Sequence, residues 1–219
     1  MKKTDSSGIF LDRNKFYTIN PECCKGIKVY NEKFMRQKNV EYRSWNPFRS
    51  KLAAAFQNGF KIKIKPSFNV LYLGAATGTT VSHVSDIIQD GIIFAVESSP
   101  IAMKKLIEVS RNRRNIISIL QDANHPDRYQ SLISSVDMVY QDISQRNQAE
   151  IFIKNIQTYL KKTGTGIIMV KARSIDVSLR PKDAYEQVCT TLKKQGLKIV
   201  DMIDLKPYEK DHMAILVKY

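Results

Sequence analysis

Short apolar runs alternate with longer amphipathic segments along the chain from about residue 69 onward. The short runs are rich in β-branched residues, as strands are, and the longer segments repeat apolar residues every three to four positions, as helices do. The pattern predicts strands over Asn69–Leu73, Ile92–Val96, Ile116–Leu120, Val136–Gln141, Gly166–Val170, Leu197–Asp204 and Met213–Val217. It predicts helical segments over Thr80–Gln89, Pro100–Arg111, a short turn at Asp127–Ser134, Gln145–Leu160 and Arg180–Gln195.

Strands that alternate with helices predict an α/β fold, in which a doubly wound, mostly parallel sheet of seven strands carries helices on both faces. The last two strands are the exception, because only about eight residues, Leu205–His212, join them. A parallel connection needs a dozen or more residues, so we expect the final strand to run antiparallel to its neighbours.

The N-terminal part of the chain has a different pattern. Short β-like pieces, Ile9–Leu11, Phe16–Ile19 and Ile27–Tyr30, are separated there by Asn, Pro and Gly. They predict a small β-rich region over residues 1–45, followed by the α/β domain over residues 46–219. At the boundary, Asn46 has the character of a helix N-cap and Pro47 that of a first-turn residue, which predicts a helix continuing through Phe56.

Composition narrows the class of protein. The 219 residues are 43% hydrophobic, with no apolar stretch near the length of a membrane span and no apolar signal-peptide core among residues 1–8, so we expect a soluble intracellular protein. Lys and Arg outnumber Asp and Glu by 35 to 21, and the net charge of +14 favours nucleic acid, ahead of an anionic membrane. Of the three cysteines, Cys23 and Cys24 are adjacent, and the set matches neither a disulfide framework nor a zinc site, so no metal is expected.

The first predicted strand runs into a loop of small residues that ends in a helical segment. This loop, residues 74–80, is not a dinucleotide fingerprint, because Ala76 replaces the second glycine, and no Lys follows its last glycine as in a P-loop. S-adenosyl-L-methionine carries no phosphate, and needs close backbone approach and hydrogen-bonding groups instead. The groups available for it are Gly74, Ala75, Gly78, Thr79 and Thr80. The alternative is a tight strand-to-helix turn that binds nothing.

Two carboxylates follow the next two predicted strands. Glu97 lies 19 residues after Gly78, close to the spacing at which a carboxylate accepts both hydroxyls of an adenosine ribose. Asp122 follows the third strand, where it is placed to meet the adenine amino group. Ligands of open α/β sheets bind outside the carboxyl ends of the strands, where both residues lie. The alternatives are that Glu97 is a solvated residue at a strand end and that Asp122 caps a helix.

Three further polar residues are expected at the same edge. Asp142 follows the fourth strand and Lys171 the fifth, while His212 precedes a final strand that runs in the opposite direction. Methyl transfer to a weakly acidic hydroxyl needs a base, or a cation that favours the developing alkoxide, and lysine can supply either. Lys51 is placed to supply a second cation, which would lower the pKa of a neighbouring amine. The alternative is that Lys51 and Lys171 are surface lysines that face solvent and take no part in catalysis.

Three segments of the chain resemble signatures of the fibrillarin family: Tyr42–Ala55, Gly74–Asp86 and Lys171–Asp176. The resemblance extends over roughly residues 40–219. The resemblance implies the Rossmann-like fold of S-adenosylmethionine-dependent methyltransferases, and RNA ribose 2′-O-methylation. It assigns a Lys-Asp-Lys-His tetrad to Lys51, Asp142, Lys171 and His212. It assigns cofactor contacts to Thr79, Thr80, Glu97, Asp122, Ala123, Asp142 and Gln145. Ser98 stands at the position of the family's usual adenine-stacking aromatic, and Ile101 or another nearby apolar group is the expected substitute.

The resemblance also implies partners. Archaeal fibrillarins work in box C/D ribonucleoproteins, in which a guide RNA pairs with the target rRNA or tRNA beside a Nop-domain scaffold protein and a K-turn-binding ribosomal-type protein. Base pairing would then carry the sequence specificity, in keeping with a charge of +14 and no sequence-reading module. Only 9 glycines occur, with no Gly/Arg-rich tail, which favours the archaeal form and a cytoplasmic location. A stand-alone RNA methyltransferase and a catalytically inactive scaffold stay open as alternatives.

Overall fold

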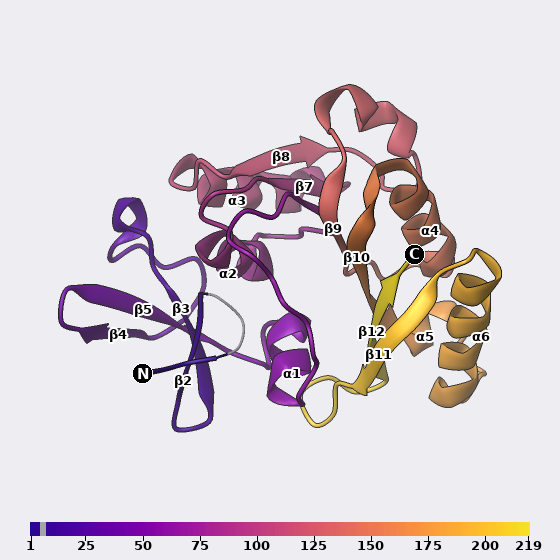
Figure 1. The fold of residues 1–219 in the computed structure, drawn as a ribbon, viewed down its shortest axis with the longest axis horizontal. Helices are drawn as coiled ribbons and strands as arrows, with labels where there is room; N and C mark the ends of the chain where they lie inside the picture. Colours follow the sequence, from indigo (N-terminus) through magenta and orange to yellow (C-terminus); the bar gives the residue numbers. More distant parts are fainter. Residues whose placement is uncertain (5–7) are drawn as a thin grey trace.

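The chain forms two sheets with a short helix between them (Figure 1). The computed structural model describes residues 1–4 and 8–219, so residues 5–7 of the predicted N-terminal β region lie outside the described residues. Helix α1 (Lys51–Gln57) contacts strands of both sheets and joins them.

The larger sheet has seven strands in the order β11-β12-β10-β9-β6-β7-β8. Only the pairs that involve β12 are antiparallel within this sheet, as the short connection before it predicts. The predicted mixed sheet is therefore confirmed. Its strands are β6 (Val70–Leu73), β7 (Ile93–Glu97), β8 (Ile116–Leu120), β9 (Val136–Gln141), β10 (Leu160–Lys171), β11 (Lys198–Asp204) and β12 (His212–Lys218).

One strand begins earlier than its pattern indicates. Strand β10 was predicted to begin at Gly166, but it begins at Leu160. Its register against β9 shifts between Leu160 and Thr165. The intervening residues are mostly polar and half-exposed or exposed, so no apolar alternation marks them as strand.

The long helices are close to their predicted positions, and α3 shows why. Ser99 caps it by accepting a hydrogen bond from the Ala102 backbone N–H, and Pro100 occupies its first turn. Among the described helices, none is long and apolar enough to cross a membrane. The helices of this domain are α2 (Thr79–Ile87), α3 (Pro100–Arg111), the 3-10 helix η2 (Pro126–Leu132), α4 (Gln148–Tyr159), the short α5 (Ala172–Ile175) and α6 (Pro181–Lys194).

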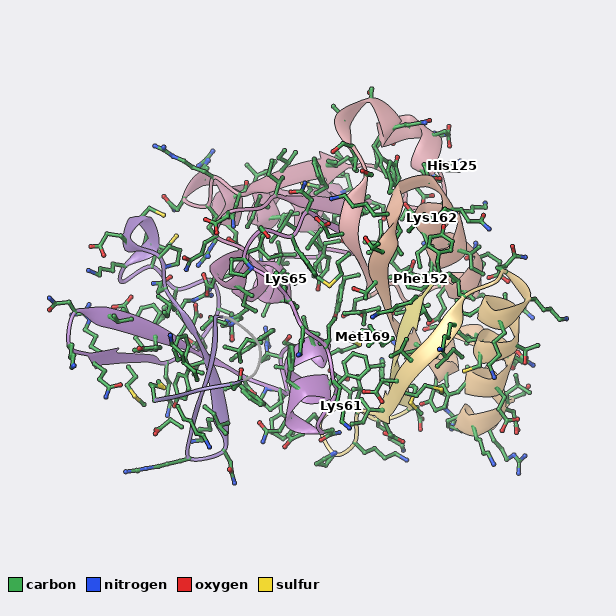
Figure 2. The ribbon with its side chains drawn as sticks, viewed as in Figure 1. Lys61, Lys65, His125, Phe152, Lys162 and Met169 are labelled. Atoms are coloured by element: carbon green, nitrogen blue, oxygen red, sulfur yellow. The ribbon has the colours of Figure 1, made fainter. Side chains whose placement is uncertain are left out.

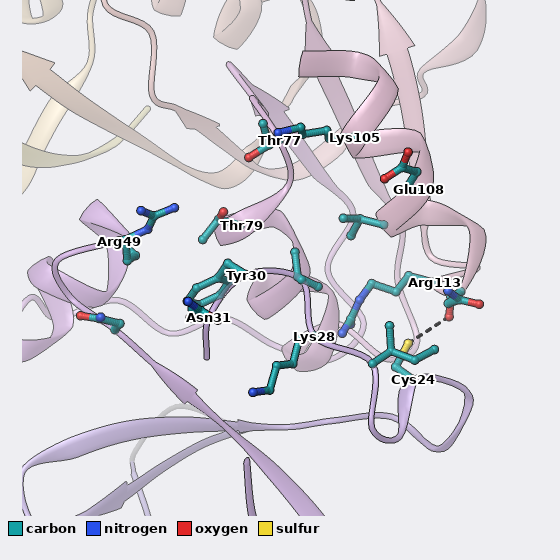
Figure 3. Close-up of a pocket in the computed structure, with 15 residues that line it drawn as sticks. Cys24, Lys28, Tyr30, Asn31, Arg49, Thr77, Thr79, Lys105, Glu108 and Arg113 are labelled. Carbon is teal, nitrogen blue, oxygen red and sulfur yellow. Dashed lines mark hydrogen bonds between the residues drawn. The ribbon is translucent and has the colours of Figure 1, made fainter. Parts of the chain in front are cut away.

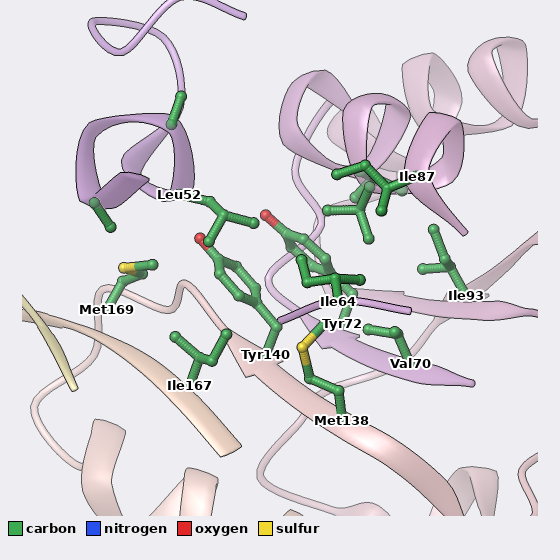
Figure 4. Close-up of a cluster of buried hydrophobic side chains, with 14 of the residues drawn as sticks. Leu52, Ile64, Val70, Tyr72, Ile87, Ile93, Met138, Tyr140, Ile167 and Met169 are labelled. Atoms are coloured by element: carbon green, nitrogen blue, oxygen red, sulfur yellow. The ribbon is translucent and has the colours of Figure 1, made fainter. Parts of the chain in front are cut away.

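Apolar side chains fill both faces of the large sheet. Alternate residues of β6 face opposite sides, so Tyr72 joins the core under α1, α2 and α3, while Leu71 joins the core under α4 and α6. In Figure 4, Leu52 of α1 lies over Tyr140 of β9. Full burial of such a leucine contributes about 1.5–3 kcal/mol. This packing sets the first turn of α1 above the carboxyl end of β9.

The segment between α1 and β6 continues the same alternation in extended form. Ile62 and Ile64 are buried in the core under α1, while Lys61 and Lys65, which Figure 2 labels, are exposed. This connection therefore adds to the core on one side and to the positive surface on the other.

The start of α1 differs from the prediction. Ser50 is the N-cap, with its hydroxyl accepting from the Ala53 N–H at 3.3 Å, so the prediction of Asn46 as the cap is wrong. The Asn46 side chain accepts instead from the Phe48 N–H, and its carbonyl from the Arg49 N–H, in a turn that precedes the helix. Asn caps turns as readily as helices, which is why the local pattern misplaced the start.

The N-terminal sheet is antiparallel, with the order β1-β2-β3-β5-β4. Its strands are β1 (Lys2–Lys3), β2 (Ile9–Asp12), β3 (Lys15–Ile19), β4 (Phe34–Gln37) and β5 (Val40–Trp45). Two of the predicted pieces are confirmed as β2 and β3, but the strand predicted at Ile27–Tyr30 is wrong. The backbone N–H groups of Val29 and Tyr30 donate to the Glu32 carboxylate and not to a neighbouring strand. The hairpin β4–β5 was missed, because its strands have only four and six residues and charged side chains interrupt the apolar ones.

A buried charge cluster fastens this sheet to α2. The Arg43 guanidinium of β5 lies 2.8 Å from a Glu32 oxygen and 2.7 Å from Asp86 Oδ2, and all three side chains have 0% exposure. Arg113 donates to the other Asp86 oxygen. His83, on the same helix, stacks on Trp45 with ring centroids 5.1 Å apart. The domain junction is therefore ionic as well as apolar.

Candidate active site

A tight turn after β6 forms the floor of the site. Gly74 has φ +79°, and a Cβ there would press against the carbonyl oxygen of Asp142, so glycine is what permits this approach. The N–H groups of Gly74 and Ala75 both donate to the Val96 carbonyl, at 3.0 and 3.1 Å. These bonds tie the turn to the end of β7.

A cavity of about 240 Å³ opens beside this turn, along the carboxyl ends of β6, β7, β8 and β9. Most of the predicted cofactor residues line it, and so do several that sequence analysis missed. The predicted ones are Gly74, Glu97, Ser98, Asp122, Ala123, Asp142 and Gln145; the missed ones are Ala76, Val96, Gln121, Ile143 and Ser144. The missed residues are direct chain neighbours of predicted ones, so the rule that ligands bind where parallel strands end would have found them. Ile101, the suggested apolar substitute, is 80% exposed and does not line the cavity.

Four predicted cofactor residues do not line this cavity. Ala75 and Gly78 are buried within the loop, and the buried Thr80 donates its hydroxyl hydrogen to Ser50 Oγ. Thr79 lines a larger cavity of about 860 Å³ between the N-terminal region and α3 (Figure 3). That cavity has cationic walls, including Arg49 and Lys105, but none of the predicted tetrad residues lines it. Chemistry, and not size, therefore selects the smaller cavity.

The two carboxylates of the cavity are held in place by backbone donors. Glu97 accepts from the Ala76 N–H and the Ser99 N–H, each at 2.8 Å. Asp122 accepts from the N–H and the side-chain amide of Asn124, and the backbone bond is the main cause that lowers its pKa below the usual range. Asp122 thus caps a turn, the alternative weighed for it, and is also charged at neutral pH. Carboxylate oxygens retain further acceptor capacity for hydroxyl or amino groups of a ligand.

The predicted tetrad residues meet at the same edge of the sheet. Lys51 Nζ lies 2.8 and 3.0 Å from the two carboxylate oxygens of Asp142, and both side chains are 19% exposed. Lys171 and His212 face each other in the antiparallel register of β10 and β12. The Gln148 amide exchanges two hydrogen bonds with the Lys171 backbone, at 3.0 and 3.2 Å, and so fixes that strand end. Within the described residues, the Lys171 ammonium has no hydrogen bond or ion pair.

The imidazole of His212 is held in one tautomer. Its Nδ1 lies 2.7 Å from the Lys210 carbonyl oxygen, so Nδ1 carries the hydrogen and donates. Burial is the main cause that lowers the pKa of His212, and the positive charge of Lys51 lowers it further. The ring is therefore neutral at pH 7. Its Nε2 is buried and has no partner among the described residues, which leaves a lone pair aimed into the structure.

Together these residues form one polar rim. Asp142 connects its two halves, because its backbone touches the Gly74 turn while its carboxylate holds Lys51. No cluster of three or more His, Cys, Asp or Glu suited to a metal ion occurs in the described part of the chain. The donor set fits an adenosine-type ligand beside a group that can hold or accept a proton.

Comparison with known proteins places the chain. The family model named Fibrillarin matches residues 1–219. A relative from Methanothermobacter thermautotrophicus, named fibrillarin-like rRNA/tRNA 2′-O-methyltransferase, is 44% identical over 212 residues, which cover 96% of this chain and 94% of the relative.

Solved structures agree with this match. The fibrillarin structure from Aeropyrum pernix, described with natively bound S-adenosyl-L-methionine, has a TM-score of 0.87 and 39% identity, covering 98% of this chain and 96% of its own. A structure of a fibrillarin/Nop5p complex superposes with a TM-score of 0.89 and 42% identity, covering 99% of each chain. The chain therefore belongs to the fibrillarin family.

Proposed function

We propose that this protein is an S-adenosylmethionine-dependent RNA ribose 2′-O-methyltransferase, which acts on rRNA and tRNA within a box C/D guide ribonucleoprotein. The observation that carries the proposal is the position of Asp142. Asp142 lines the cavity proposed for the cofactor, and its carboxylate lies 2.8 Å from the Lys51 ammonium. The proposal is supported by the rRNA/tRNA 2′-O-methyltransferase name of the 44% identical relative.

The cavity supplies what the cofactor needs. Glu97 and Asp122 present carboxylate oxygens for the ribose hydroxyls and the adenine amino group, and Gly74 allows close backbone approach. Val96 and Ile143 provide an apolar wall where the family's usual aromatic position is occupied by Ser98. Ala123 and Gln145 are the remaining lining residues of this proposal, and Ala75, Gly78, Thr79 and Thr80 shape the adjoining loop without lining the cavity. When bound, S-adenosyl-L-methionine supplies an electrophilic methyl group; the chain's residues supply position and proton handling.

The tetrad addresses the weak acidity of the 2′-hydroxyl. Asp142 holds the Lys51 ammonium at the rim, and Lys171 adds a second amine without a partner among the described residues. The Lys51 cation so placed stabilises negative charge as it develops on the attacking oxygen. The hydroxyl oxygen gains the methyl group, and its proton passes to a basic atom of the cluster. In its neutral form the Lys171 amine would accept that proton, with His212 as its register partner on β12.

The partners follow from the family. A Nop-domain scaffold protein is supported by the fibrillarin/Nop5p complex, to which this chain is 42% identical. Guide RNA, a K-turn-binding ribosomal-type protein and a cytoplasmic location belong to the same proposal. A net charge of +14 supports binding to an RNA backbone.

The test is methylation by a reconstituted particle with radiolabelled cofactor, mapped to one nucleotide. Asp142→Ala should lower the transfer rate by about 10²- to 10⁴-fold, the usual contribution of positioned acid–base groups, while the thermal unfolding midpoint stays near that of the wild type. Asp137→Asn is the matched control. Asp137 is the second residue of the same strand, at the end opposite Asp142, and pairs with Lys161 at 2.7 Å, so the substitution should leave the transfer rate unchanged.

Each alternative has its own outcome. Full activity of Asp142→Ala would remove Asp142 from the mechanism. Methylation of bare RNA without guide or scaffold would indicate a stand-alone enzyme. Well-folded protein that binds no S-adenosyl-L-methionine in calorimetric titration would indicate an inactive scaffold.

A further inference from the structure

Asp211 joins the ends of β10 and β12 beyond the last register pair of these strands. Lys171 and His212 form that last pair, and Asp211 directly precedes His212. The Asp211 carbonyl oxygen accepts from the Ala172 N–H at 3.1 Å, and its carboxylate oxygen Oδ2 lies 3.1 Å from Arg173 Nε. Asp211 therefore binds both residues that follow Lys171.

The guanidinium of Arg173 also reaches a third segment. Its Nη1 donates to the Val177 carbonyl at 2.9 Å, in the loop after α5. One planar group can bind both partners because its Nε and Nη donors point in fixed directions, whereas a lysine ammonium is a single point charge. We name these contacts of Arg173, with Asp211 and Val177, the arginine clasp.

The arginine clasp holds a turn of unusual backbone conformation. Asp211 has φ +58°, in the left-handed region that residues other than glycine, Asn and Asp seldom adopt. Backbone of this kind persists where the surrounding contacts fix it. The Arg173 side chain is 46% exposed, so the ion pair itself adds little to the stability of the fold. The clasp therefore matters more for the position of the turn than for folding.

The position of the Lys171 amine depends on this turn. The amine has no hydrogen bond or ion pair within the described part of the chain, so the backbone that carries it decides where it lies. Gln148 of α4 holds the Lys171 backbone, and the Asp211 contacts hold the two residues that follow. On the facing strand end, the Lys210 carbonyl orients the His212 ring at 2.7 Å. Misplacing a reacting group by about 1 Å can cost about 10²-fold in rate.

We propose that Arg173 and Asp211 are positioning residues, which hold Lys171 beside His212 for the proton transfer. This inference rests on the proposed function for the reaction itself. Neither side chain gives or accepts the transferred proton. Because the two act through one ion pair, losing both should cost about as much as losing one.

The kinetic experiment measures kcat and KM in the reconstituted particle. Arg173→Ala should lower kcat by about 10- to 100-fold and leave the KM for RNA and the cofactor Kd unchanged, because only the reacting amine is misplaced. Arg173→Lys should lose as much, since an ammonium cannot bind both Asp211 and Val177. The double variant with Asp211→Gly, which tolerates the positive φ, should lose no more than Arg173→Ala.

Arg180→Ala is the matched control. Arg180 is 81% exposed and pairs with Asp183 at 2.8 Å at the start of α6, outside the tetrad. A wild-type kcat is expected for this variant. Unfolding midpoints near that of the wild type are expected for all of these variants, because exposed ion pairs contribute little to stability.

A second measurement needs no methyl transfer. Burial is the main cause that lowers the pKa of His212, and the charges that act on the ring, those of Lys51, Glu209 and Asp142, are unchanged in Arg173→Lys. This variant keeps the positive charge but opens the clasp. In an NMR titration of the whole chain, the His212 pKa should therefore rise toward about 6.5 as the ring gains solvent.

Three results would overturn the proposal. One is a wild-type kcat in Arg173→Ala. Another is a raised KM in Arg173→Ala that Arg173→Lys restores, which would show that the positive charge binds the RNA backbone. The third is an unchanged His212 pKa in Arg173→Lys. This last result counts even in a protein that methylates nothing, so failure of the clasp is distinguishable from failure of the proposed function.

Discussion

Asp86→Asn tests how the N-terminal sheet is held to the methyltransferase-type domain. Asp86 is 1% exposed and accepts from Arg43 at 2.7 Å, from the Thr18 hydroxyl at 2.6 Å and from Arg113. The substitution preserves volume but removes the negative charge, so two buried guanidinium groups are left with the single carboxylate of Glu32. Removal of one partner from a buried ion pair costs about 3–5 kcal/mol.

The assay is urea unfolding, combined with a thermal scan. For a chain of this size, about 1 kcal/mol shifts the midpoint by about 2–4 °C, so Asp86→Asn should lower it by about 6–20 °C. Lys161→Met is the control, because its pair with Asp137 is solvent-accessible, with side-chain exposures of 39% and 24%. That variant should lose no more than about 1 kcal/mol. An Asp86→Asn protein within about 1 kcal/mol of the wild type would refute the buried-charge argument.

Three further outcomes follow from single residues. Gly74→Ala should weaken S-adenosyl-L-methionine binding in calorimetric titration and lower the unfolding midpoint, because its Cβ would meet the Asp142 carbonyl at φ +79°; wild-type affinity would contradict this. Burial, followed by the charges of Arg43 and Arg113, holds the pKa of His83 well below its usual range. Below the unfolded pKa of about 6.5, the unfolded chain therefore binds a proton that the folded chain does not. The unfolding free energy should fall as pH drops from 7 to 5, by at most about 1.4 kcal/mol per pH unit for this group, and be flat above. An unchanged pH slope in His83→Gln would oppose the assignment. Ser50→Ala should cost about 1 kcal/mol in urea unfolding, because the Ser50 hydroxyl caps α1 and also accepts from Thr80; no loss would contradict the cap.

Periodicity predicted the large sheet well because its signal is local. The central parallel strands β6, β7 and β9 are buried on both faces, and each long helix buries one side, so the apolar pattern changes where these elements begin. The direction of β12 followed from the length of one connection. The N-terminal sheet was predicted less completely. Strands β4 and β5 are short, and their apolar runs are interrupted by charged residues. Glu32 accepts from the backbone donors that the pattern had assigned to a strand at Ile27–Tyr30.

Part of the site was also predictable. Parallel strands end at one edge of the sheet, so Glu97, Asp122, Asp142 and Lys171 had to lie along that edge once the strands were known. The direction of the last strand added His212 to that edge, and the family resemblance selected Lys51 from many other lysines.

Contacts between distant parts of the chain were decided by the tertiary structure alone. Lys51 meets Asp142, 91 residues away, because Leu52 packs α1 over the end of β9. Phe48 likewise meets Tyr208, 160 residues away, with ring centroids 5.0 Å apart. The sequence by itself determined which residues form strands and helices and at which end of a strand each polar group stands, since these depend on neighbours within a few positions. Partners, burial and pKa depend on how whole elements pack, which no local pattern records.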